Sequence, residues 1–121
     1  MRDFTFVDDV AQGVVLALDR PPPPDPGFDK LRGDPAASDA PYRVFNIGNH
    51  RPVQLADFIA AIEGQVGKPA IRRWRDIQPG DVAVTCADVD VFAQWTGFRP
   101  GVAVDEGVRR FVAWFRDYYR V

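Results

Sequence analysis

A strand pattern changes into a helix pattern within residues 2–10, which read Arg2-Asp3-Phe4-Thr5-Phe6-Val7-Asp8-Asp9-Val10. Phe4 and Phe6 alternate with other residues, as on one face of a β-strand. Asp8 or Asp9 can then cap a helix that continues to about Leu18. A strand that begins at the second residue is unusual for a free-standing domain, whose first residues are often poorly ordered. We therefore expect that the chain was cut from something longer or begins at an internal methionine.

Strand and helix patterns alternate along the rest of the chain. Further strand or extended segments are predicted at residues 42–48, 69–75 and 82–86. Further helices are predicted at residues 55–66, between an Asp88 cap and Gly97, and at about 105–119. The helix positions follow from apolar residues at helical spacing and from glycines that end helices. This alternation predicts an α/β fold in one domain that spans residues 1–121.

A proline-rich loop is predicted at residues 20–41, which hold seven of the eleven prolines, including Pro21 to Pro24. Proline lacks the amide donor and fixes one backbone dihedral, so neither a helix nor a sheet interior is expected here. The four consecutive prolines could be a ligand for a domain that binds proline-rich peptides. An extended surface connection is the interpretation that we favour.

Composition excludes several classes of protein. The net charge is -2, which provides no field that draws the chain to nucleic acid or anionic lipid. The one basic cluster, Arg72-Arg73-Trp74-Arg75, is short and is interpreted as a solvated strand with one packed tryptophan. No apolar run is long enough to suggest a membrane span. Cys86 is the only cysteine, which favours a reducing compartment, and we expect a cytoplasmic protein.

No complete catalytic site is present in the sequence. The only serine, Ser38, lies in the proline-rich loop, and neither Lys30 nor Lys68 has a tyrosine four residues before it. The Gly64-Gln65-Val66-Gly67 segment ends a helix, whereas a dinucleotide-binding glycine motif follows a strand. His50 is interpreted as a solvated loop residue and Cys86 as a small buried apolar residue. The sequence therefore predicts a chain without catalytic residues or a metal site of its own.

Three segments in order resemble one family. Residues 2–10 are similar to the Arg-Asp-Phe/Tyr-x-x-Val/Ile-x-Asp motif in the C-terminal part of NAD-dependent nucleotide-sugar epimerases and dehydratases, which are extended short-chain dehydrogenases. Residues 42–48, Tyr42-Arg43-Val44-Phe45-Asn46-Ile47-Gly48, resemble a strand of that family. Gln78-Pro79-Gly80-Asp81-Val82, followed by Ala87-Asp88, resembles its Gly-Asp turn and capped helix. The proline-rich insertion and the glutamine before Pro-Gly-Asp most resemble the UDP-glucuronate 4-epimerase branch.

The resemblance implies a C-terminal fragment of a Rossmann-type fold that lacks the dinucleotide-binding half. In the parent enzyme, NAD takes a hydride from C4 of the sugar and returns it to the other face. The glycine-rich NAD loop and the Tyr-x-x-x-Lys pair belong to the missing N-terminal half. We therefore expect this fragment to bind no NAD, to be inactive alone, and to correspond to the part that grips the UDP-sugar.

The family motifs also imply substrate-binding roles for Arg2, Gln78 and Asp81. Arg2 would contact the diphosphate, for which a fixed and always charged guanidinium is suited. Asp81 would accept hydrogen bonds from the ribose hydroxyls. Many relatives carry arginine in place of Gln78, so its contact with phosphate would be uncharged. The structural alternatives are a strand-end salt bridge for Arg2 and a turn-stabilising cap for Asp81.

Two alternatives to a UDP-glucuronate 4-epimerase fragment stay open. One is a fragment of another nucleotide-sugar epimerase, dehydratase or decarboxylase, and the other is a free-standing, non-catalytic binding module. A fragment would leave apolar surface uncovered on the helix that carries Val10, Val14 and Leu18 and on both sides of the strand at 44–47. Such surfaces promote self-association. The predicted protein partners are therefore the missing N-terminal half and, for the isolated chain, other copies of itself.

Overall fold

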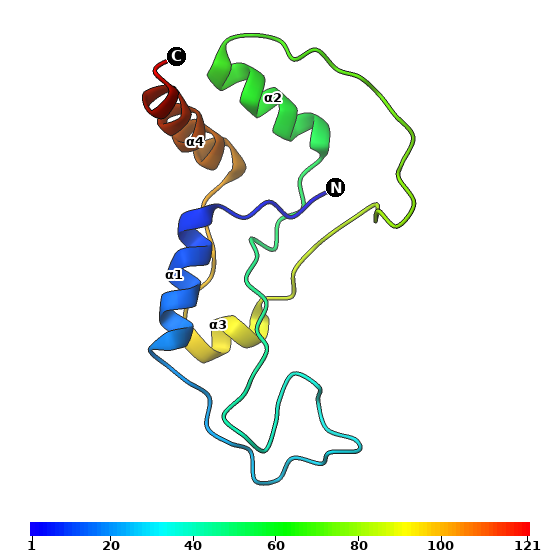
Figure 1. Cartoon of the computed structure of the whole chain (residues 1–121), viewed down its shortest axis with the longest axis vertical. Helices are drawn as coiled ribbons and strands as arrows, with labels where there is room; N and C mark the ends of the chain where they lie inside the picture. Colours follow the sequence, from blue (N-terminus) through cyan, green and yellow to red (C-terminus); the bar gives the residue numbers. More distant parts are fainter.

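The computed structural model describes all residues, 1–121, and contains four α-helices joined by long extended segments (Figure 1). The helices are α1 (Val7–Leu18), α2 (Leu55–Val66), α3 (Asp90–Thr96) and α4 (Val104–Tyr119). All four lie where the sequence predicts helices, within about two residues at each end. Helix placement was therefore predictable from apolar spacing.

The predicted strands are not formed as a sheet, and in this respect the α/β prediction is wrong for the isolated chain. Only two isolated antiparallel bridges occur, Arg2 with Val53 and Ala37 with Arg43. Residues 2–6 and 42–48 are extended but have no regular ladder beside them. A strand needs a neighbour to satisfy its amides and carbonyls, and no segment of this chain supplies one along the full length.

Glycine ends two helices as predicted. Gly67 and Gly97 take the left-handed conformation, with φ of 75° and 74°, directly after α2 and α3. The predicted aspartate cap of α1 is wrong, because Phe6 occupies the cap position and no side chain caps the helix. Asp88 accepts a hydrogen bond from the Asp90 amide at 3.1 Å, but the cap position of α3 belongs to Val89.

Two apolar contacts, rather than one large core, hold the helices together. The α2 and α4 helices form the one extensive helix–helix contact, with Val108 and Val112 buried on α4. The second contact lies between α1 and α3, where Gly13 allows close approach of Ile47 and Phe92, and Phe92 is only 1% exposed. Only 10 of 121 residues are buried, so little apolar surface is removed from water for a chain of this length.

The N-terminal segment crosses between these two groups of helices (Figure 1). Asp3 joins it to both neighbouring loops, because its carboxylate accepts hydrogen bonds from the amides of His50, Arg51 and Ala87 at 3.1, 3.3 and 3.0 Å. Gly48 lies against this junction, since a Cβ there would be 2.4 Å from the Ala87 Cβ. Asp3 was not predicted to be important beyond its place in the motif.

Several apolar side chains that the sequence predicts to be uncovered are exposed. Val10, Val14 and Leu18 on α1 are 36%, 47% and 74% exposed, and Val44 is 49% exposed. Two sequence interpretations are corrected here, because Cys86 is exposed rather than buried and Trp74 is 79% exposed rather than packed. Neither residue has a sheet or second layer within the chain to cover it.

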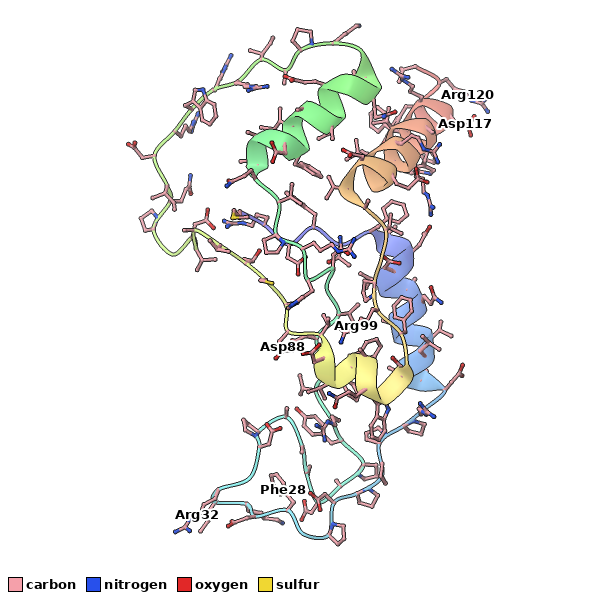
Figure 2. All side chains as sticks on the ribbon, turned by 180° about the vertical axis from the view of Figure 1, so that it is seen from behind. Phe28, Arg32, Asp88, Arg99, Asp117 and Arg120 are labelled. Carbon is pink, nitrogen blue, oxygen red and sulfur yellow. The ribbon has the colours of Figure 1, made fainter.

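The proline-rich loop at residues 20–41 contains no helix or regular strand and is mostly exposed, as the favoured interpretation predicts. Its first residue is fastened to α3 by two hydrogen bonds, from Trp95 Nε1 to the Arg20 carbonyl and from Arg20 Nη1 to the Trp95 carbonyl. The labelled residues Phe28 and Arg32 lie in the loop, remote from the other labelled residues (Figure 2). None of the helices is long and apolar enough to cross a membrane.

Candidate functional site

Arg2 and Asp81, which are far apart in sequence, meet at the start of the N-terminal segment. Arg2 Nη2 donates to Asp81 Oδ1 at 2.5 Å. The same guanidinium donates through Nη1 to the carbonyl oxygens of Val82 at 2.5 Å and Met1 at 3.2 Å. The structure therefore brings together two of the three residues to which the sequence assigns substrate binding.

Backbone pairing fixes the position of Arg2. Its amide and carbonyl exchange two hydrogen bonds of 2.9 Å with Val53, on the segment that leads into α2. Asp3, directly after it, is held by the three amides described above. The guanidinium therefore extends from a backbone that is tied on both sides, which lowers the entropy lost when it binds an anion.

Asp81 is presented by a tight turn. The Asp81 amide donates to the Gln78 carbonyl at 3.1 Å, and Gly80 has a φ of 88° at the third position of the turn. Pro79 before that glycine completes the residue pattern of a type II turn. The carboxylate also accepts from the Val82 amide at 2.9 Å, so it stabilises the turn as well as pairing with Arg2.

Gln78 takes part through its backbone only. Its carbonyl closes the turn, whereas its side chain is exposed and makes no hydrogen bond within the chain. Gln78 therefore belongs to the same turn as Asp81, but its side-chain amide makes no hydrogen bond to Arg2 or Asp81.

The Arg2–Asp81 pair is accessible to solvent. The Arg2 and Asp81 side chains are 31% and 49% exposed. A surface ion pair of this kind contributes about 0–1 kcal/mol to stability, so neither residue is fixed by a large folding contribution. A partly exposed guanidinium and an exposed carboxylate on a tight turn can bind a phosphate and a pair of hydroxyls respectively.

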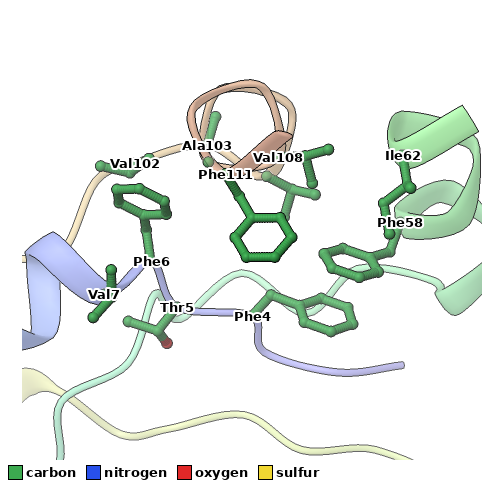
Figure 3. Close-up of a pocket in the computed structure, with 12 residues that line it drawn as sticks. Phe4, Thr5, Phe6, Val7, Phe58, Ile62, Val102, Ala103, Val108 and Phe111 are labelled. Atoms are coloured by element: carbon green, nitrogen blue, oxygen red, sulfur yellow. The ribbon is translucent and has the colours of Figure 1, made fainter. Parts of the chain in front are cut away.

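An apolar hollow of about 380 Å³ lies behind the N-terminal segment, between α2 and α4 (Figure 3). Phe4 and Phe6 both line it, together with the intervening Thr5 and the following Val7. Phe4 stacks on Phe58 with ring centroids 3.9 Å apart, and Phe111 of α4 projects between the Phe4 and Phe6 rings. The hollow has almost no polar lining and does not contain Arg2 or Asp81, so it is a gap in an apolar contact rather than a catalytic site.

Metal and dinucleotide sites have known requirements, which concern the cluster of ligating side chains and the place of a glycine-rich segment. No group of three or more histidine, cysteine or acidic side chains could hold a metal ion. His50 Nδ1 lies 2.7 Å from the Ala87 carbonyl and 3.8 Å from Cys86 Sγ, which is too small a set for a stable site. The glycines of residues 64–67 end α2, with no strand before them, so these residues do not fit a dinucleotide.

The chain is similar in sequence to part of several known proteins, which include UDP-glucuronate 4-epimerases. It is 42% identical over 120 residues to Protein CapI of Staphylococcus aureus and 40% identical over 120 residues to a probable UDP-glucuronate 4-epimerase of Rhizobium meliloti. These matches cover 99% and 98% of this chain but 36% and 35% of the relatives, so the chain spans about a third of their length. No protein-family model matches the chain.

A solved structure resembles the same region. UDP-glucuronic acid 4-epimerase of Bacillus cereus, in complex with UDP-4-deoxy-4-fluoro-glucuronic acid and NAD, superposes with a TM-score of 0.71 at 25% identity. The superposition covers 97% of this chain and 32% of that one. These matches confirm the resemblance that the three sequence motifs predicted.

Proposed function

We propose that this chain, which is similar to about a third of the UDP-glucuronate 4-epimerases, forms the C-terminal, nucleotide-sugar-binding part of such an enzyme. The observation that carries this proposal is the meeting of Arg2 and Asp81. Both residues lie in motifs that resemble the family's substrate-binding segments, and they come together in the folded chain.

In the proposed complex, Arg2 binds the diphosphate of the UDP-sugar. Asp81 occupies one side of the guanidinium, and Arg2 Nε and the remaining N–H groups make no hydrogen bond within the chain. A guanidinium held at one edge by a carboxylate can present its other edge to phosphate oxygens in a fixed orientation. Asp81 both holds the Arg2 guanidinium in its orientation and accepts hydrogen bonds from the ribose hydroxyls through its free lone pairs.

Gln78 is proposed to donate a hydrogen bond to the ligand. It lies three residues before Asp81 on the same turn, and its amide is unengaged and exposed. Because it carries no charge, it contributes less to phosphate affinity than an arginine would.

NAD is proposed to bind the whole enzyme through residues outside this chain. When bound there, it supplies the hydride transfer that 4-epimerisation requires. The residues present here do not fit the dinucleotide, and we assign none of them a step in the transfer. The isolated chain is proposed to be inactive.

Substitutions test the proposal. In the isolated chain, UDP titrated into Arg2→Ala is expected to bind about tenfold to a hundredfold more weakly than into the unaltered chain, because a charge-assisted hydrogen bond contributes about 1.5–3 kcal/mol. Asp81→Asn should weaken binding in the same direction but less. Arg73→Ala, which removes an exposed arginine without a hydrogen-bond partner, is the matched control.

Chemical shifts of the backbone amides report binding and folding in the same experiment. Shifts that change on addition of UDP should cluster at residues 1–3 and 78–82. A folded chain whose spectrum is unaffected by millimolar UDP, or in which Arg2→Ala and Arg73→Ala bind equally, would contradict the proposal.

A further inference from the structure

The segment of residues 76–85, which carries Asp81, has no helix or strand and is exposed along its whole length. All its hydrogen bonds to the rest of the chain go to residues 1–3. Besides the contacts of Arg2 described above, they include a bond of 3.2 Å from the Asp3 amide to Thr85 Oγ1. The position of Asp81 therefore depends on how residues 1–3 hold this segment.

The Asp3 carboxylate fastens residues 1–3 to the chain on both sides. Its Oδ2 accepts hydrogen bonds from the amides of Ala87 at 3.0 Å and His50 at 3.1 Å. Ala87 lies two residues after the 76–85 segment, and His50 lies three residues before the backbone partner of Arg2. One carboxylate therefore joins the two segments that hold Arg2 in place.

The junction around Asp3 suits a carboxylate of this length. A Cβ on Gly48 would lie 2.4 Å from the Ala87 Cβ and 3.0 Å from Asp3 Oδ2, so the backbone approaches closely on that side. The carboxylate accepts from three amides, the third being that of Arg51 at 3.3 Å. An asparagine has a single acceptor oxygen, and its NH₂ group would face an amide N–H, which offers no acceptor.

From these contacts we propose that Asp3 is a positioning residue for nucleotide-sugar binding. It does not contact the ligand, and it holds the Arg2 guanidinium and the Asp81 carboxylate in the relative position that binds a diphosphate and its ribose. This inference rests on the proposed function. Without the Asp3 carboxylate, both side chains lose order that must be regained when the ligand binds, and this costs affinity.

Titration of UDP into the full chain, followed through the backbone amide shifts, tests this role. Asp3→Asn preserves the size of the side chain and should weaken UDP binding about tenfold, because two ligand-binding side chains lose their preset orientation. Asp9→Asn is the matched control, since Asp9 also accepts from two remote amides, at 3.1 and 2.9 Å, but lies outside the site. The control should destabilise the chain and change UDP affinity less than about twofold.

A double substitution distinguishes positioning from an independent contribution to binding. If Asp3 acts through Arg2, adding Asp3→Asn to Arg2→Lys should weaken binding by less than about threefold beyond Arg2→Lys alone, whereas independent effects would add the full tenfold. Circular dichroism shows whether each variant is folded. If Asp3→Asn does not fold, Thr85→Val decides, because it removes the acceptor of the Asp3 amide at nearly constant volume and should weaken UDP binding about twofold to threefold.

Relaxation of the amide ¹⁵N nuclei without UDP separates this inference from the proposed function. Residues 81–87 should become more mobile in Asp3→Asn and should stay as ordered in Asp9→Asn as in the unaltered chain. Unchanged order of residues 81–87 in Asp3→Asn, unchanged UDP affinity, additive effects with Arg2→Lys, or equal weakening by Asp9→Asn would each overturn the inference. If the unaltered chain binds no UDP, the proposed function fails, and the relaxation result alone decides whether Asp3 positions the Arg2–Asp81 pair.

Discussion

Asp9 is expected to contribute more to stability than any other carboxylate of α1, although the sequence indicated only a helix cap. It is 7% exposed, and its Oδ2 accepts hydrogen bonds from the amides of Gly101 and Val102 at 3.1 and 2.9 Å. These bonds fasten the link between α3 and α4 to α1. A hydrogen bond to a charged group contributes about 1.5–3 kcal/mol. Because Gly101 is exposed and its amide can return to water, Asp9→Ala should cost about 2–3 kcal/mol in all.

Urea unfolding followed by circular dichroism measures this cost, and hydrogen exchange at Val102 locates it. Asp8→Ala is the matched control, because the neighbouring side chain is 67% exposed and makes only the 3.6 Å contact with Arg110. That control should change the free energy of unfolding by less than about 0.5 kcal/mol. Equal costs for the two substitutions, or unchanged exchange at Val102 in Asp9→Ala, would refute the reasoning.

Three further predictions follow from particular contacts. Gly48→Ala should destabilise the chain by about 1–3 kcal/mol, because its Cβ would meet Ala87, whereas Gly64→Ala, with nothing within 4 Å, should stabilise α2 by about 0.5–1 kcal/mol in the same urea titrations. Hydrogen bonds from Arg109 and Arg110 lower the pKa of Glu106 from 4.5 to about 2, so its contribution to stability is complete above pH 4.5 and is lost as the pH falls through about 2. A carboxyl resonance of Glu106 that titrates near 4.5 would contradict this. The exposed apolar residues of α1 should bind a hydrophobic dye in the native state, and a chain that leaves the dye dark at pH 7 would show that they are covered.

The helices could be predicted from sequence because their determinants are local. Leu55, Phe58, Ile59 and Ile62 repeat at helical spacing, and Gly67 ends the helix by adopting a backbone conformation that other residues avoid. The strands could not be predicted in the same way, because a strand is stabilised by hydrogen bonds to a neighbouring strand, which can be distant in the sequence or absent from the chain. Residues 42–48 have strand composition, yet their only bridge joins Arg43 to Ala37.

The candidate site was predicted from its family motifs and not from residue chemistry alone. Nothing in the spacing of Arg2 and Asp81 indicates that they meet, and their contact depends on how three separate segments fold together. The roles of Asp3 and Asp9 were missed for a related reason. Each carboxylate accepts hydrogen bonds from backbone amides of remote loops. Almost every residue has a backbone amide, so the sequence does not indicate which of them a carboxylate will contact.

The most direct test of the central claim replaces the corresponding third of the probable UDP-glucuronate 4-epimerase of Rhizobium meliloti by this chain. The chimera should convert UDP-glucuronate, Arg2→Ala in it should raise the Michaelis constant about tenfold or more, and Arg73→Ala should leave that constant unchanged. A chimera that folds and binds NAD but neither binds nor converts UDP-glucuronate would contradict the claim that this chain provides the nucleotide-sugar-binding part of an epimerase.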